Sequence, residues 1–194
     1  MIRKYFSLTI LFVLAACTSE YSPRPRGYYR FHFPEKKYQE YSNAECPFTF
    51  EFPVYSSIRR DSMFFDSTAE NPCWMTVSFE TLNGNIFLSY KEIDKAHSLQ
   101  KLVDDCYKLA YKHTIKADEI SETPIDNKHG ATGLFYEIQG NVASEIQFYL
   151  TDSTRNFMRG SLYFNSAPNA DSIAPAVNFV RDDMIHLVNS FRWK

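Results

Sequence analysis

The feature that most constrains the fold is a pair of alternating segments on either side of an Asn-Gly dipeptide. Residues 75–79 alternate apolar and polar side chains, the sequence 86–90 has Ile86, Leu88 and Tyr90 at every second position, and Asn83 and Gly84 lie between the two segments. Alternation with a period of two places all apolar side chains on one face of a strand, and Asn-Gly is typical of a tight hairpin turn. These residues therefore predict an antiparallel hairpin with one buried face.

Further strands are predicted from the same period. Phe48, Phe50 and Phe52 alternate with polar residues and end at Pro53. Three more strands are predicted after the first helix, over residues 131–139, 145–151 and 157–165. We expect residues 28–41 to form an irregular segment that packs on the domain, and residues 56–72 to form a loop.

Two helices are predicted from apolar residues spaced three and four apart. The first begins after Ser98 as N-cap and extends to about His113. The second begins at Asp171 or Ser172, carries Pro175 in its first turn and presents one apolar stripe as far as Phe191.

The order of these elements is three strands, a helix, three strands and a helix. That order predicts an α+β fold, written βββαβββα, with a mainly antiparallel sheet of about six strands and two packed helices. It is similar to the order in Mog1/PsbP-type sandwiches. The chain has 194 residues, 44% of them hydrophobic, which is enough for one core, so we expect a single globular domain over 28–194.

The N-terminus has the pattern of an export signal. Residues 1–16 combine a short basic start with an apolar run too short to span a membrane. The sequence Leu-Ala-Ala-Cys at 14–17 resembles the bacterial lipobox, which implies that Cys17 becomes the first mature residue and carries a diacylglyceryl group and an acyl chain such as palmitate. Residues 17–27 then form a lipidated anchor and linker. The alternative is an ordinary cleaved secretory signal followed by a coincidental cysteine.

Three further cysteines bear on the exported domain. Cys46 and Cys73 each precede a predicted strand and are adjacent to a proline, so we expect them to form a disulfide in an oxidising compartment. Cys106 falls on the apolar face of the first helix and is expected to be a buried free thiol. No cysteine or histidine spacing typical of a metal site is present, so no metal is predicted.

Charge and motifs argue against several functional classes. The chain has 21 basic and 23 acidic side chains, which gives no basic excess for nucleic acid. No nucleotide-binding or hydrolase motif occurs, and neither a cofactor nor catalysis is predicted. Residues 151–154 could supply a nucleophile and an acid, but a turn is the simpler interpretation. Asp182 and Asp183 are adjacent on a helix and are expected on its solvated face.

Aromatic side chains in the strands suggest a surface for a partner. Consecutive aromatic residues such as Phe148 and Tyr149 must point to opposite faces of a sheet. If no helix covers the outer face, Tyr149 and Tyr163 form an exposed aromatic patch suited to a protein partner. The alternative is that both faces are covered.

Several segments closely resemble the family of gliding motility lipoproteins called GldD. They are residues 112–118, 147–154, 159–165, 168–172 and 191–194, together with the lipobox, Cys46-Pro47 and Cys73-Trp74. The resemblance implies a non-catalytic envelope lipoprotein that is an accessory or scaffold component for gliding motility and type IX protein secretion. It implies a lipid-anchored domain exposed to the periplasm, with other motility and secretion proteins as partners. The outer membrane is slightly favoured because no Asp follows Cys17.

A second hypothesis comes from the aromatic content. The domain could instead be a periplasm-facing module that binds a small hydrophobic or glycan ligand in an aromatic-lined cleft. That hypothesis requires a dry pocket of several hundred Å3.

Overall fold

The computed structural model describes residues 32–60, 63–64, 67–68, 71–166 and 169–194. Its main element is a seven-stranded antiparallel sheet in the order β3-β6-β7-β11-β10-β9-β8. The strands are β3 (Ser57–Arg60), β6 (Met75–Phe79), β7 (Gly84–Glu92), β8 (Ala117–Asp126), β9 (Thr132–Gly140), β10 (Ile146–Thr151) and β11 (Asn156–Phe164).

A smaller sheet lies beside the main one. It contains β1 (Tyr38–Ser42), β2 (Phe48–Pro53) and β12 (Arg192–Trp193), in the order β1-β2-β12. The remaining short elements are the strand pair β4 (Met63–Phe64) and β5 (Ser67–Thr68) and the 3-10 turns η1 (Glu80–Leu82) and η2 (Lys112–Ile115). The last residues of the chain therefore pair with one of the first strands described.

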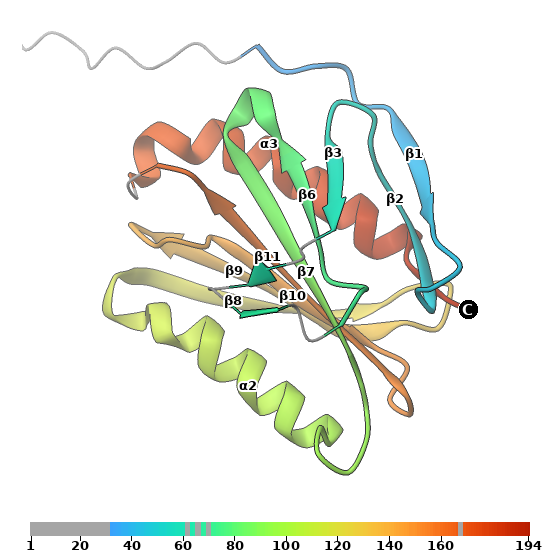
Figure 1. Cartoon of the computed structure of the whole chain (residues 1–194). Coiled ribbons are helices and arrows are strands. Elements are labelled where there is room, and N and C mark those ends of the chain that lie inside the picture. The colour runs from blue at the N-terminus through green and yellow to red at the C-terminus, as the bar shows by residue number, and fades with distance from the viewer. Residues whose placement is uncertain (1–31, 61–62, 65–66, 69–70, 167–168) are drawn as a thin grey trace, which may run out of the picture.

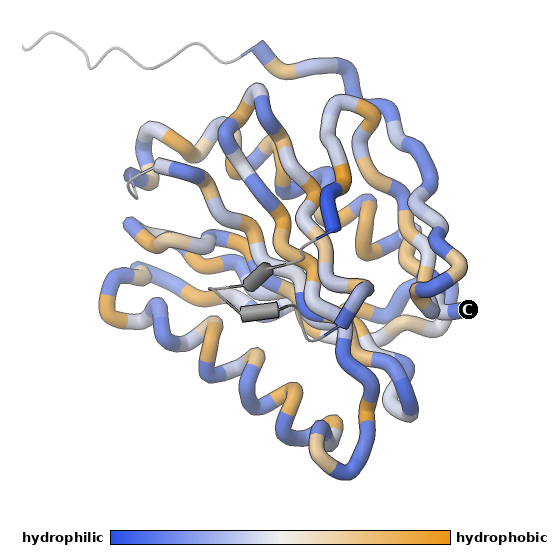
Figure 2. Tube along the Cα trace, viewed as in Figure 1, coloured by the Kyte–Doolittle hydropathy of each residue, from blue (hydrophilic) through white to orange (hydrophobic). Residues whose placement is uncertain are grey.

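Two α-helices pack on opposite faces of the main sheet (Figure 1). Helix α2 (Leu99–Tyr111) is capped by Ser98, whose side chain accepts a hydrogen bond from the Lys101 amide. Leu102, Cys106 and Ala110 form its buried stripe. Figure 2 shows hydrophobic and hydrophilic positions interspersed along α2. Helix α3 (Ala170–Ser190) covers the other face.

Neighbouring residues on β10 show how the two cores are divided. Phe148 packs in the core that includes β2, β6, β7 and α3, while Tyr149 packs with α2 against Tyr136 and Phe157. The larger core contains rings from distant parts of the chain, including the stacked pair Phe50 and Phe191. The sheet interior is therefore filled by side chains on both faces.

The predicted α+β class is confirmed, and so are the hairpin of β6 with β7 and both helices. The hairpin turn is longer than predicted because η1 precedes Asn83, which has a positive φ of 53°. Helix α3 also begins earlier than predicted. Its N-cap is Asn169, whose side chain accepts from the Ser172 amide.

Three predictions about strands were wrong. Residues 38–42 are not irregular, because their backbone pairs with β2 as β1. Residues 57–60 of the expected loop pair with β6 as β3. Finally, β8 had no counterpart in the sequence analysis. It lies at the edge of the sheet and most of its residues are exposed, so it has no apolar alternation.

Candidate functional site

The predicted lipidation residue Cys17 lies outside the described residues, as do the signal sequence and linker over residues 1–27. Lipidation therefore stays a prediction. Neither α2 nor α3, nor any other helix in the described part of the chain, has the length and apolar content needed to cross a bilayer.

The other cysteines are placed clearly. Cys46 and Cys73 form a disulfide with an S–S distance of 2.15 Å that joins the start of β2 to the approach to β6. Cys106 is the buried free thiol that the sequence predicts, and burial raises its pKa to about 12. A thiol with that pKa is protonated at neutral pH and is a poor nucleophile.

The structure corrects the predicted aromatic patch. Tyr149 is only 8% exposed, because α2 covers this face of β10 and the ring stacks on Phe157. Tyr163 is half-buried and meets Phe87 edge to face with ring centroids 5.7 Å apart. Local alternation could predict that the rings point to opposite faces, but the path of α2 over one face is not visible in that pattern.

The side chains of residues 151–154 stabilise a turn. The Asp152 carboxylate accepts hydrogen bonds from the backbone amides of Thr154, Arg155 and Asn156. Partial burial favours the protonated acid, but these hydrogen bonds outweigh it and lower the pKa of Asp152 to about 2. Ser153 has the positive φ, 64°, of such a turn. A turn accounts for all of these contacts, so no catalytic role is needed to explain them.

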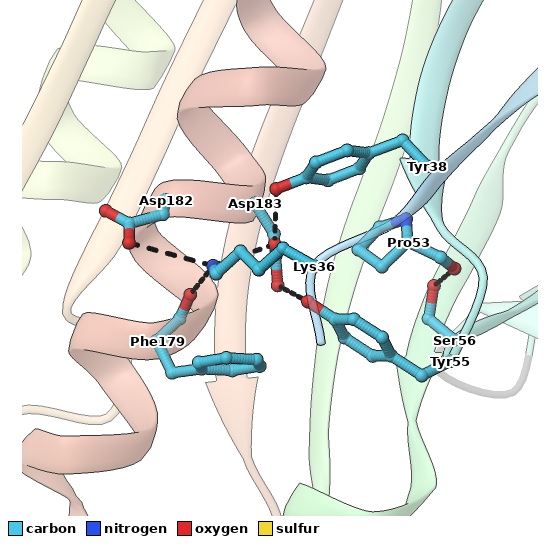
Figure 3. Close-up of polar contacts among 8 residues, drawn as sticks. All are labelled: Lys36, Tyr38, Pro53, Tyr55, Ser56, Phe179, Asp182 and Asp183. Carbon is cyan, nitrogen blue, oxygen red and sulfur yellow. Dashed lines mark hydrogen bonds and ion pairs between the residues drawn. The ribbon is translucent and has the colours of Figure 1, made fainter. Parts of the chain in front are cut away.

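Asp183 lies at the centre of a polar cluster that the sequence analysis missed (Figure 3). Asp183 is only 1% exposed, so the prediction that it lies on the solvated face of the helix was wrong. Tyr38 and Lys36 donate to Oδ1, each at 2.9 Å, and Tyr55 donates to Oδ2 at 2.7 Å. A signal was present, since Asp183 interrupts the apolar stripe of α3 three residues after Val180.

The Lys36 ammonium connects this cluster to the surface of α3. It donates to the Phe179 carbonyl at 2.6 Å and lies 4.2 Å from the centroid of the Phe179 ring. The exposed Asp182 carboxylate is 3.7 Å away. The Phe33 ring also stacks on the Phe179 ring, with the two centroids 4.4 Å apart.

Strand β1 is held on α3 by a second contact. The Tyr38 ring stacks on His186 with centroids 3.6 Å apart, and His186 Nε2 lies 2.6 Å from Glu51 Oε2. Together with the Asp183 cluster, this contact fixes the beginning of the described chain to the last helix.

The chemistry of the Asp183 cluster is structural. Burial and the hydrogen bonds to Asp183 raise the pKa of both Tyr38 and Tyr55 well above the ordinary value, so the phenols stay protonated and act only as donors. Both carboxylate oxygens accept hydrogen bonds, from three donors in all, and the residue is buried. We therefore assign the cluster to holding β1 and β2 on α3.

A groove of about 480 Å3 lies between the main sheet and the N-terminal half of α3. Asp118 and Ser121 of β8, Glu137 of β9, and Glu145 just before β10 line the sheet side. Arg181 of α3 lines the opposite side and forms a two-pronged ion pair with Glu137, in which Nη2 is 3.1 Å from Oε2 and Nε contacts Oε1.

Glu145 differs from the other carboxylates of this groove. It is 8% exposed, and its Oε2 makes no hydrogen bond among the described residues. Burial raises the pKa of the Glu145 carboxyl, and a hydrogen bond from its own backbone amide opposes that shift only in part. The local sequence contains no signal for the burial of this residue.

The described residues provide no set of ligands for a metal ion. Nowhere in residues 32–194, apart from the undescribed gaps, do three or more His, Cys, Asp or Glu side chains gather closely enough to share an ion.

The described contacts define an α+β domain whose buried polar groups connect one element to another and whose groove beside α3 is lined by several carboxylates. The chain belongs to the family of gliding motility lipoproteins called GldD, whose model matches residues 18–193. This match confirms the family that the sequence resembles.

Comparisons with individual proteins add little. The chain is similar to the solution structure of cyanobacterial PsbP (CyanoP) from Synechocystis, with 14% identity over 86% of this chain and 98% of that chain, and a TM-score of 0.45. None of the curated proteins compared with the chain matches it.

Proposed function

We propose that this chain is a non-catalytic accessory or scaffold lipoprotein that binds another envelope protein of the gliding motility and type IX secretion machinery. The observation that carries the proposal is the family match over residues 18–193. In this proposal, lipid on Cys17 holds the domain on a membrane, with the domain in the periplasm. Two or three acyl chains give durable anchoring, because each buried methylene contributes about 0.8 kcal/mol.

The described domain is suited to a scaffold. The Asp183 cluster and the stack of Tyr38 on His186 fasten the segment nearest the anchor to α3. Fixed in this way, β1 and α3 belong to one rigid unit, which suits the binding of a partner.

The filled sheet interior counts against the second hypothesis, a small-ligand module. The groove under α3 has sufficient volume for a ligand, but carboxylates line it rather than aromatic side chains. A small hydrophobic ligand would have to bury those carboxylates without compensation, which is costly.

The test is crosslinking in living cells, followed by affinity recovery and mass spectrometry. The wild type is compared with Cys17→Ala, and Cys106→Ala is the matched control because Cys106 is the buried free thiol. Motility or secretion proteins should be recovered with the wild type and the control, and lost with Cys17→Ala. Well-folded wild-type protein that recovers no such partner would overturn the proposal.

A further inference from the structure

We propose that the C-terminal end of α2, together with η2, docks on the anionic surface of the membrane to which the chain is anchored. The inference rests on the lipid anchor at Cys17 in the proposed function and adds a second membrane contact, made by the folded domain itself. It is carried by the exposure of Ile115, by the lysines on either side of it and by two tyrosines of the preceding turns.

Apolar side chains are exposed at this end of α2 more than elsewhere in the described fold. Five large hydrophobic residues are exposed in the described part of the chain, and three of them, Tyr107, Leu109 and Ile115, lie within nine residues. Ile115 is 92% exposed, and no residue of η2 is buried. A single exposed apolar residue needs no explanation, but a cluster of them marks an interaction surface.

The same segment is basic. Residues 107–116 contain Lys108, Lys112 and Lys116 and no acidic residue. Lys108 lies 3.8 Å from Asp105, whereas Lys112 and Lys116 form no ion pair with any described residue. The chain as a whole is slightly acidic, but at physiological ionic strength exposed charges are screened beyond about 8 Å. The local excess of lysine therefore determines what this surface attracts.

The nearest acidic side chains lie to the sides of this segment. Asp104 and Asp105 lie near the middle of α2. Asp118 lines the groove beside α3, on the opposite face of the main sheet, and Glu122 of β8 interacts with the Tyr111 phenol. The end of α2 therefore presents a net positive charge, which complements anionic lipid headgroups.

The arrangement of these side chains suits a flat partner. Successive residues of an α-helix are about 100° apart, so Lys108 and Lys112 lie between the two tyrosines on one side and Leu109 on the other. The Tyr107 and Tyr111 rings stack with their centroids 4.1 Å apart. Helix α2 lies on the outside of the main sheet, and none of the described elements covers its outer face (Figure 1).

The residue types favour lipid over a protein partner. Lysine is depleted at the centre of protein interfaces. Lysine, tyrosine and an exposed aliphatic side chain together are instead typical of segments that lie in a membrane interface. In the docked domain, Ile115 lies below the headgroups, the tyrosine rings lie at headgroup level, and the lysine ammonium groups contact lipid phosphates.

The tether is long enough for this contact. Fourteen residues, 18–31, separate Cys17 from His32, where the described chain begins. A fully extended chain covers at most about 3.5 Å per residue, or roughly 50 Å over this distance. A compact domain of this length is roughly 40 Å across. Any face of the domain can therefore reach the membrane that holds the lipid.

The first test places a nitroxide label on η2 in the lipoprotein purified from membranes. Thr114→Cys supplies an exposed attachment site, and Asn178→Cys on α3 is the matched control site. Cys106 is buried and Cys46 and Cys73 are bonded to each other, so these cysteines do not compete for the label. The protein is reconstituted into vesicles of phosphatidylcholine alone or mixed with anionic phosphatidylglycerol. Electron paramagnetic resonance then measures the access of oxygen and of a water-soluble nickel chelate to each label.

With phosphatidylglycerol, the ratio of oxygen access to chelate access should rise severalfold at position 114 and stay unchanged at position 178. Added salt should reverse the change, because it screens the lysines from the headgroups. A label at position 114 that stays in water in both kinds of vesicle would overturn the proposal. A label that becomes immobile only after envelope proteins are added would overturn it as well, because the surface would then bind protein.

Two pairs of lysine variants test the charge. Lys112→Gln combined with Lys116→Gln should lower the ratio of docked to undocked domain about tenfold or more, because two charges that attract anionic lipid are lost. Lys95→Gln combined with Lys128→Gln removes two exposed lysines outside the segment and is the matched control. Equal effects of the two pairs would contradict the assignment.

A second pair of variants tests the apolar contact. Ile115→Ser should lower the ratio of docked to undocked domain about tenfold, because the side chain no longer removes apolar surface from water. Val54→Ser is the matched control, since Val54 is 48% exposed and follows β2. Unchanged docking of the Ile115→Ser protein would show that η2 is not the inserted end.

The vesicles contain no other protein, so the result does not depend on the partner of the proposed function. If the label stays in water while living cells yield motility or secretion proteins that depend on Cys17, the proposed function stands and this inference fails. If the domain docks and no partner is recovered, this inference stands and the scaffold function fails. If the intact mass of the purified protein shows no acyl chain, both fail.

Discussion

The phenol of Tyr55 donates a hydrogen bond of 2.7 Å to the Oδ2 atom of Asp183, although the two residues are 128 positions apart. This bond joins the turn after β2 to the centre of α3. Because Asp183 is buried and accepts hydrogen bonds from three side chains, one carboxylate joins the small sheet and the segment before it to the helix.

Asp183→Asn should lower the free energy of unfolding by about 2–4 kcal/mol. The amide keeps the shape but removes the charge that Lys36 faces, and its NH2 group meets donors instead of acceptors. Urea unfolding followed by circular dichroism measures the change. Asp182→Asn is the control. Its side chain is 64% exposed, so its effect should stay within about 0.5 kcal/mol, and an equal loss in both variants would argue against the cluster.

Replacing Cys46 and Cys73 together with serine should lower the free energy of unfolding by about 2–4 kcal/mol. The disulfide closes a loop between residues 27 positions apart, and losing it frees the unfolded chain. Dithiothreitol should lower the Tm of the wild type and leave that of the double variant unchanged. Since Cys106 is present in both proteins, an equal effect of dithiothreitol on both would show that the stabilisation does not come from this disulfide.

The sequence predicts elements whose pattern is local. The strands β2, β6 and β7 carry apolar residues at every second position, and α2 and α3 follow three-four spacing, so these elements are visible in the local sequence. The prediction of one buried face was wrong for β6, which is buried on both faces. Strand β8 could not be predicted from such a pattern. It is held by backbone pairing with β9 while most of its side chains face solvent, so it buries no face that alternation could reveal.

The candidate sites were less accessible to sequence reasoning for a different reason. Asp183 and Glu145 acquire their properties from elements that are distant in the chain and close in the fold. The Asp183 carboxylate could have been suspected from its position on an apolar stripe. By contrast, Glu145 lies in a polar stretch, and only the tertiary fold makes it a buried acid.

Gly133→Ala should destabilise the domain by about 2–3 kcal/mol. A Cβ at this position of β9 would lie 1.8 Å from the Tyr149 carbonyl oxygen of the neighbouring strand, so the backbone itself must move. The matched control is Gly130→Ala, where no atom lies within 4 Å of the added Cβ and φ is +80°. That substitution should cost only about 1–2 kcal/mol of backbone strain. Urea unfolding of the two variants tests the difference, and equal losses would contradict the steric argument.

Glu145→Gln should change how stability depends on pH. Burial raises the pKa of Glu145 in the folded protein above the value of 4.5 expected for the unfolded chain. The protonated acid is thus the form that the fold favours, and its contribution is complete below pH 4.5 and lost as pH rises through the folded pKa. Glutamine does not titrate, so the variant does not lose stability in this way as pH rises. The variant should therefore gain stability relative to the wild type as pH rises from 4 to 8.

Urea unfolding of both proteins at a series of pH values measures this difference, in which the other titrating groups cancel. Glu119→Gln removes an exposed carboxylate and should differ from the wild type by less than about 0.5 kcal/mol at every pH. A constant difference between Glu145→Gln and the wild type would mean that the Glu145 carboxylate is already compensated in the fold. A difference that grows with pH would instead show that the ionised Glu145 carboxylate destabilises the folded domain.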